Sequence, residues 1–179
     1  MARKLEIATN IAILIAATLA SVVLVRNFLF PRTANSARPP SVAVGTTLSV
    51  PGFDWRSNGN TVVLALSTNC HFCSESAPFY RRLADELSRR RVHLTAVLPQ
   101  DANESGEYLR ALQLAFGDVR QIPLRTLQIR GTPTLLLVDE RGVVRHVWEG
   151  KLTAEREQQV LETVLAIPAR PTPVASVSK

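Results

Sequence analysis

The sequence predicts an α/β fold in which helices cover both faces of a mixed central sheet, preceded by one N-terminal transmembrane helix. Three observations predict it. Two apolar runs, Val62 to Leu66 and Thr134 to Val138, are typical of central strands that are covered on both faces. Amphipathic helical patterns alternate with such runs along the chain. Ahead of them, 15 of the 19 residues from Ile7 to Val25 are apolar and none is charged.

The N-terminal apolar segment is long enough to cross a membrane, because 19 residues in a helix span roughly 28 Å. We expect a short cytoplasmic N-terminus at 1–6, a transmembrane anchor at 7–25 and a linker at 26–44. Basic residues flank both ends of the segment. We choose the orientation that exports the domain, partly because of the cysteines. A cleaved signal peptide is the alternative, since Arg3 and Lys4 resemble its basic start. Either interpretation places the domain outside the cytosol.

The net charge of +6 is concentrated near that segment. Residues 1–40 hold five basic residues and one acidic residue, which leaves 16 basic and 14 acidic residues for the rest of the chain. A nearly balanced domain is not typical of a nucleic-acid-binding protein. The sequence also has no glycine-rich phosphate loop and no acidic metal cluster. We therefore expect no nucleic-acid partner.

The working domain is expected at 45–167, before a disordered, proline-containing tail at 168–179. Its first strand is Val62 to Leu66, and a helical pattern follows from Cys73 to Arg90. Val92 to Leu98 is predicted as a second strand, and Ser105 to Phe116 as a second helix.

The second half of the domain begins with an irregular stretch. Thr134 to Val138 is then a buried strand, and Val143 to Trp148 returns beside it after a turn at 139–142. Thr153 can cap a last helix, and extra strand material is expected near Thr46 to Val50. The order β-α-β-α-β-β-α predicts the mixed sheet.

The segment Cys70-His71-Phe72-Cys73 carries the candidate chemistry, where the chain leaves the first strand and enters a helix. Free amide groups at a helix start stabilise a thiolate, and one helical turn brings the second sulfur within bonding reach of the first. Cys70, nearer to solvent, would attack, and Cys73 would resolve the mixed disulfide. A protonated His71 would further stabilise the Cys70 thiolate and make the disulfide more oxidising.

Other interpretations of the cysteine pair remain open. A structural zinc needs four ligands, but His93 and His146 lie on predicted strands, where we interpret them as surface or half-buried residues. Covalent haem needs a histidine directly after the second cysteine, where this chain has Ser74. A Cu(I) site or an inert bridge also fits two cysteines.

The chain resembles the thioredoxin family at about residues 45–167. The resemblance rests on the Cys-x-x-Cys segment, on Pro78 in the following helix, and on Gly131-Thr132-Pro133-Thr134 before a strand. It implies a cis-proline at Thr132-Pro133 that lies against the disulfide, with the Thr132 backbone free to pair with a substrate. The N-terminal anchor, Asp139-x-x-Gly142 and Gly150 resemble the membrane-anchored TlpA/ResA subgroup, with MauD as another anchored relative.

The chain departs from the family pattern near its cysteines. Leu64 stands where thioredoxin keeps a buried acid, and Ser76 where anchored reductases often place a glutamate. Glu75 is adjacent, but a shift of one residue on a helix rotates it by about 100°. We therefore expect His71, Phe72 and Glu75 to tune the redox chemistry, with water, His71 or Glu75 exchanging the proton of Cys73.

These residues and the resemblance together predict an extracytoplasmic, membrane-anchored thiol–disulfide oxidoreductase without a cofactor or metal. We favour reduction of exported proteins, with re-reduction by a membrane electron donor of the DsbD/CcdA kind that the resemblance implies. The alternative function is a copper metallochaperone for oxidase assembly, with Cys70, Cys73 and a histidine as soft ligands. A thiol peroxidase is disfavoured, because Val63 and Ser67 replace the proline and threonine that usually precede a peroxidatic cysteine.

Overall fold

The computed structural model describes Thr18 and residues 41–168. The expected N-terminus at 1–6, nearly all of the anchor at 7–25, most of the linker at 26–44 and the tail after residue 168 lie outside these residues. Within the described part of the chain, no helix combines the length and apolarity needed to cross a membrane. Val42, at the end of the expected linker, is buried, and its amide donates to the Gln128 carbonyl oxygen.

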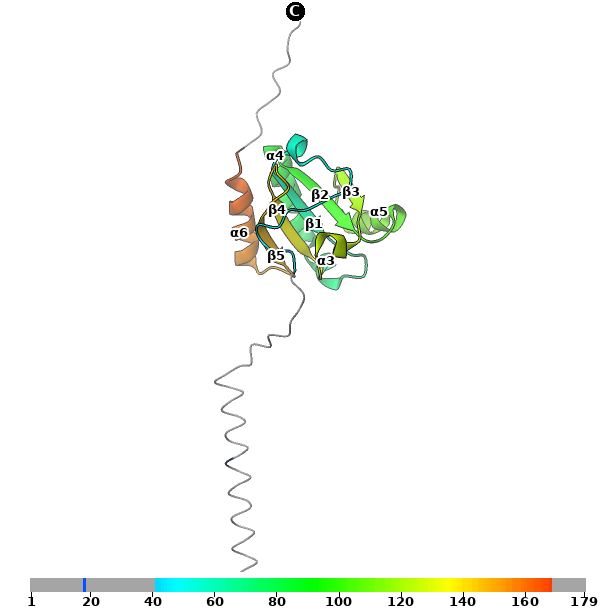
Figure 1. The fold of residues 1–179 in the computed structure, drawn as a ribbon. Coiled ribbons are helices and arrows are strands. Elements are labelled where there is room, and N and C mark those ends of the chain that lie inside the picture. Colours follow the sequence, from blue (N-terminus) through cyan, green and yellow to red (C-terminus); the bar gives the residue numbers. More distant parts are fainter. Residues whose placement is uncertain (1–17, 19–40, 169–179) are drawn as a thin grey trace, which may run out of the picture. The chain divides into compact units, whose positions relative to one another are not determined.

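The centre of the domain is a five-stranded sheet with the order β3-β2-β1-β4-β5 (Figure 1). β1 is parallel to β2 and β2 to β3, whereas β4 is antiparallel to both β1 and β5. The mixed sheet predicted from the sequence is thus confirmed. The strands are β1 (Thr61–Ala65), β2 (His93–Leu98), β3 (Asp118–Gln121), β4 (Thr134–Val138) and β5 (Val144–Glu149).

Helical segments connect and flank these strands. The predicted helix from Cys73 to Arg90 is two helices, because the chain breaks at Ser76. Thr153 caps the last helix by accepting a hydrogen bond from the Arg156 amide, as predicted. The helices are α2 (Trp55–Asn58), α3 (His71–Glu75), α4 (Ala77–Arg90), α5 (Ala102–Ala111), the 3-10 helix η1 (Leu124–Leu127) and α6 (Ala154–Leu165).

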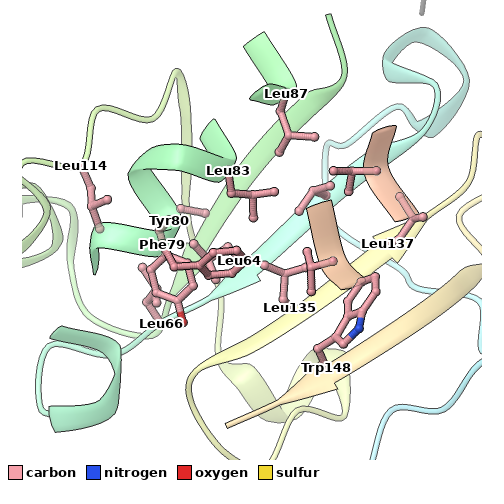
Figure 2. Packing of buried hydrophobic residues seen from close by; sticks show 14 of the residues in the cluster. Leu64, Leu66, Phe79, Tyr80, Leu83, Leu87, Leu114, Leu135, Leu137 and Trp148 are labelled. Carbon is pink, nitrogen blue, oxygen red and sulfur yellow. The ribbon is translucent and has the colours of Figure 1, made fainter. Parts of the chain in front are cut away.

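The three longest helices pack on one apolar cluster (Figure 2). Leu64 of β1 and Leu66 just after it meet the α4 side chains Phe79 and Leu83, and Leu135 of β4 lies beside Leu64. Alternate residues of a strand point to opposite faces, so Leu64 belongs to this cluster while its neighbours Val63 and Ala65 belong to another. Cys73 is part of the first cluster, which ties the candidate site to the core.

The opposite face of the sheet is covered mostly by irregular segments, whereas we expected helices on both faces. Here Val63, Val97 and Leu136 pack against side chains from residues 42–53 and 122–129. The only helical elements that contribute to this second cluster in the described chain are η1, through Leu124 and Leu127, and α2, through Trp55. The irregular segments supply enough apolar side chains to cover this face without a long helix.

Three secondary-structure elements also differ from the sequence-based expectation. β3 lies in the stretch expected to be irregular, because pairing with β2 rather than an apolar pattern defines this half-exposed edge strand. α5 begins earlier than predicted, since the Asp101 carboxylate accepts hydrogen bonds from the amides of residues 103 and 104. The strand expected near Thr46 to Val50 is reduced to a bridge between Thr47 and Val143.

Candidate redox site

The cysteine segment follows the C-terminal end of β1 and forms the start of α3 (Figure 1). Cys70 is the N-cap of α3, and Cys73 lies one turn into the helix. Pro78, which has no amide hydrogen to donate, occupies the first turn of α4 and accompanies the break at Ser76. The short helix α3 therefore carries both cysteines as a unit separate from α4.

The two cysteines form a disulfide but differ in exposure. Their Cα atoms are 5.2 Å apart. Cys70 is partly exposed, whereas Cys73 is fully buried in the core cluster. The Cys70 Sγ accepts a hydrogen bond from the Cys73 amide at 3.1 Å. Only one sulfur of the pair is thus open to a partner from solution, and a backbone donor is in place to stabilise negative charge on it.

The Thr132-Pro133 segment lies against Cys70, as the resemblance to the thioredoxin family implies. The Thr132 carbonyl oxygen is 3.2 Å from the Cys70 Sγ, and the Thr132-Pro133 peptide bond is cis. The Pro133 carbonyl accepts a hydrogen bond from the Gly150 amide at 2.8 Å. The loop after β5 therefore holds the segment that borders the exposed sulfur.

A charged pair on the surface of α3 connects it to the same loop. The Glu75 carboxylate lies 3.1 Å from His71 Nε2 through Oε1, and 2.9 Å from Lys151 Nζ through Oε2. The Lys151 hydrogen bond is the main reason that the pKa of Glu75 is lowered from its ordinary value, and the proximity of His71 adds to it. The Glu75 carboxylate therefore bridges two neighbours, His71 on the same helix and Lys151 in the loop after β5.

The surroundings of Cys73 hold no buried carboxylate in the part of the chain that the structure describes. Leu64, which stands where thioredoxin has a buried acid, is fully buried. Ser76 is buried and donates from its hydroxyl to the Phe72 carbonyl oxygen at 2.8 Å. The one buried acidic residue among the described positions, Asp139, follows the far end of β4. Among the described residues, no buried carboxylate is therefore in place to exchange the proton of Cys73.

The remaining candidate residues divide between this site and the sheet. Phe72 is exposed beside His71, with ring centroids 6.0 Å apart. His93 is half-buried and its Nε2 lies 3.1 Å from an Asp118 carboxylate oxygen, while His146 is exposed and stacks on Trp148. Both of these histidines thus have the structural surroundings expected from the sequence. No three histidine, cysteine or acidic side chains among the described residues group together as metal ligands.

Comparisons with known proteins support the fold. No known protein-family model matches the chain, and no curated protein sequence matches it. A protein assigned as the thiol:disulfide interchange protein DsbE from Chlorobium tepidum superposes with a TM-score of 0.58 at 17% identity, over 70% of this chain and 98% of that one. The thioredoxin domain of a thiol-disulfide oxidoreductase from Bacteroides vulgatus superposes with a TM-score of 0.53 at 13% identity, over 69% and 99% of the two chains.

A third solved structure shows that the fold does not by itself define the reaction. Peroxidoxin BcpB from Mycobacterium tuberculosis superposes with a TM-score of 0.55 at 16% identity, over 69% of this chain and 97% of that one. At identities this low, the superpositions establish only that the described domain has a thioredoxin-like fold. The activity has to be argued from the site.

One residue of the site was not among those predicted from the sequence. Lys151 is 76 positions from Glu75, and no local pattern links the two. The only sequence signal nearby is Gly150, which the resemblance singles out without assigning a role to its neighbour.

Proposed function

We propose that this chain is a thiol–disulfide oxidoreductase that uses Cys70 as the attacking thiol and Cys73 as the resolving thiol. One observation carries the proposal: a partly exposed Cys70, whose sulfur accepts a hydrogen bond from a backbone amide, is bonded to a fully buried Cys73 at the start of a helix. This asymmetry suits a reaction in which only one sulfur meets the partner protein.

In the reducing direction, the Cys70 thiolate attacks one sulfur of a substrate disulfide. A mixed disulfide forms, and the other substrate sulfur leaves as a thiolate. Cys73 then loses its proton and attacks the Cys70 sulfur, which re-forms the Cys70–Cys73 disulfide and releases the second substrate thiolate. Two electrons pass from the protein dithiol to the substrate disulfide, and the reverse sequence oxidises a substrate dithiol.

The Thr132-Pro133 segment is placed to position the substrate. Because the Thr132 carbonyl lies beside the Cys70 sulfur, an extended substrate segment that pairs with this backbone would bring its own sulfur next to Cys70. Phe72 offers an exposed apolar surface on the same short helix. We infer a role for Thr132 and Pro133 in binding the substrate, and for Phe72 in contacting or tuning it.

We further propose that the domain is anchored in the cytoplasmic membrane by residues 7–25, faces the extracytoplasmic or periplasmic side, and acts as a reductase of exported proteins. The apolar N-terminal segment and the resemblance to anchored members of the fold support this proposal. A reductase in an oxidising compartment must itself be re-reduced. A membrane dithiol donor of the DsbD/CcdA kind would supply those two electrons.

Replacement of the resolving cysteine tests the reaction. The full chain carrying Cys73→Ser should accumulate mixed disulfides on Cys70 in cells, visible as adducts that a reductant removes. The Cys70→Ser variant is the matched control and should accumulate none, because its remaining thiol is buried. Absence of adducts on Cys70, together with a wild-type chain that stays fully oxidised, would contradict the proposed activity.

The direction of electron flow is tested by the reduction potential of the Cys70–Cys73 pair. Equilibration with glutathione redox buffers gives this value directly. A potential more reducing than that of the compartment supports the reductase. A strongly oxidising potential would instead assign the protein to disulfide donation.

A further inference from the structure

The helix α5 lies beside the cysteine segment because β1 and β2 are parallel. Ala65, the last residue of β1, is in register with Val97 of β2, so the chain leaves both strands at the same end of the sheet. After β1 it forms a short loop and α3, and after β2 it forms α5. Two segments that are distant in the sequence therefore meet next to the disulfide.

Two polar contacts from α5 flank the cysteine pair. The Thr68 hydroxyl donates a hydrogen bond to a Glu104 carboxylate oxygen, and the hydroxyl oxygens of Ser74 and Tyr108 lie 3.4 Å apart. The first contact lies two residues before the first cysteine, and the second lies directly after the second cysteine. Glu104 and Tyr108 are four residues apart, a spacing that places both side chains on the same side of α5.

Gln100, just before α5, continues this row of contacts. It lies four residues before Glu104, and its Nε2 donates a hydrogen bond to Ser67 Oγ at 2.9 Å. The Ser67 carbonyl oxygen in turn accepts a hydrogen bond from the Cys70 amide at 3.1 Å. The row of contacts thus extends to the residue that holds the backbone of the first cysteine.

The α5 segment is itself fixed to the rest of the domain. Leu109 is buried in the first apolar cluster, and the buried Ser105 donates from its hydroxyl to the Gln100 carbonyl oxygen at 3.3 Å. Arg81 of α4 donates to the Leu112 carbonyl oxygen at the end of α5 at 2.8 Å. The contacts with the cysteine segment therefore start from a well-packed helix.

We propose that Glu104 and Tyr108 are positioning residues that favour the disulfide of Cys70 and Cys73 over the dithiol. A disulfide forms only where the two sulfurs can reach each other in a narrow geometry. Contacts on both sides of the pair restrict how far its two ends can separate after reduction, which raises the effective concentration of one thiol at the other. The proposal rests on the proposed function and names two residues outside the cysteine segment that tune it.

The test is the equilibrium between the full chain, which has only two cysteines, and glutathione. The protein dithiol passes two electrons and two protons to glutathione disulfide, which yields the protein disulfide and two glutathione molecules. Thr68→Val and Tyr108→Phe each remove one hydroxyl group. Each should lower the equilibrium constant for disulfide formation about twofold to threefold, part of the net contribution of one hydrogen bond, and the double variant about fourfold or more.

Variants of the α5 acids separate positioning from charge. Glu104→Gln keeps an oxygen that can accept from Thr68, so its equilibrium constant should stay near that of the wild type, whereas Glu104→Ala should behave like Thr68→Val. Equal effects of Glu104→Gln and Glu104→Ala would assign the effect to charge and overturn the proposal. Glu107→Ala is the matched control, because Glu107 is exposed on the same helix and its side chain has no polar partner among the described residues.

Urea unfolding of both redox forms separates positioning from a general loss of stability. The double variant Thr68→Val/Tyr108→Phe should destabilise the oxidised form more than the reduced form. Equal losses in the two forms, with an unchanged equilibrium constant, would overturn the proposal. The proposed oxidoreductase activity would survive that result if the Cys73→Ser chain still traps substrates. A shifted constant without trapping would contradict the proposed activity and leave the positioning role in place.

Discussion

Two glycines with the same backbone conformation should respond very differently to alanine. Gly142 and Gly150 both have a φ of 77°, and the amide of each donates a hydrogen bond, to the Asp139 and Pro133 carbonyl oxygens respectively. A Cβ atom added at Gly150 would meet no atom within 4 Å, whereas one at Gly142 would lie 2.9 Å from Trp55 Cδ1. The pair therefore separates the cost of the backbone conformation from the cost of the side-chain clash.

The expected magnitudes follow from these two terms. Gly150→Ala should lower the free energy of unfolding by about 1–2 kcal/mol, the cost of a Cβ atom in the left-handed region. Gly142→Ala adds an overpacking cost of about 1–3 kcal/mol. The Trp55 ring cannot yield freely, because it packs on Phe53 with ring centroids 4.4 Å apart. We therefore expect Gly142→Ala to be the more damaging change by about 1–3 kcal/mol.

The assay is urea unfolding of the oxidised fragment 41–168, followed by circular dichroism so that changes near Trp55 do not affect the signal. In a Trp55→Ala background the difference between the two glycine variants should shrink towards zero, because the clashing ring is gone. Equal losses for the two variants, or a difference that persists without the ring, would refute the steric explanation.

Three other predictions concern buried groups. Burial raises the pKa of Asp139, but hydrogen bonds from backbone amides and the Arg145 guanidinium outweigh it and lower the pKa below the ordinary value. Asp139 thus stabilises the fold above about pH 4 and loses this effect as the pH falls through its lowered pKa. In Asp139→Asn, the urea concentration at the unfolding midpoint should therefore decrease less between about pH 4 and lower pH than it does in the wild type. Burial raises the pKa of Tyr80 to about 12, and a Tyr108→Phe chain should show a phenolate absorbance midpoint there; a midpoint near 10 would contradict its burial. Leu64 is fully buried, so Leu64→Ala should cost about 2–5 kcal/mol in urea unfolding, and a loss below about 1 kcal/mol would contradict the packing.

The candidate site was largely accessible from the sequence because its chemistry is local. The spacing of Cys70 and Cys73 at a strand–helix junction places both thiols within one helical turn. The apolar runs around β1 and β4 likewise predict central strands, since such runs are buried on both faces. The resemblance placed Thr132-Pro133 beside the disulfide, where the structure finds it.

Other features depend on long-range contacts that no local pattern encodes. β3 has polar and charged residues at most of its positions and becomes a strand through its pairing with β2. The start of α5 is different, because it is set locally by the Asp101 carboxylate, which caps the amides of residues 103 and 104, rather than by the apolar period. The second face of the sheet is covered by irregular segments whose apolar side chains have no repeating pattern.

The sequence by itself determined where the two thiols lie and which segments form the central strands. The spacing of the cysteines and the apolar runs of the strands are each contained within a few consecutive residues, so they can be seen without knowledge of the fold. Only the tertiary structure decided which cation meets Glu75 and how closely the Thr132 carbonyl oxygen approaches the exposed sulfur of Cys70. The antiparallel pairing of β1 with β4 brings the segment before β4 to Cys70, and the hairpin to β5 brings Lys151 to the same end of the sheet. These contacts join residues more than 60 positions apart, and their geometry follows from the register of the strands.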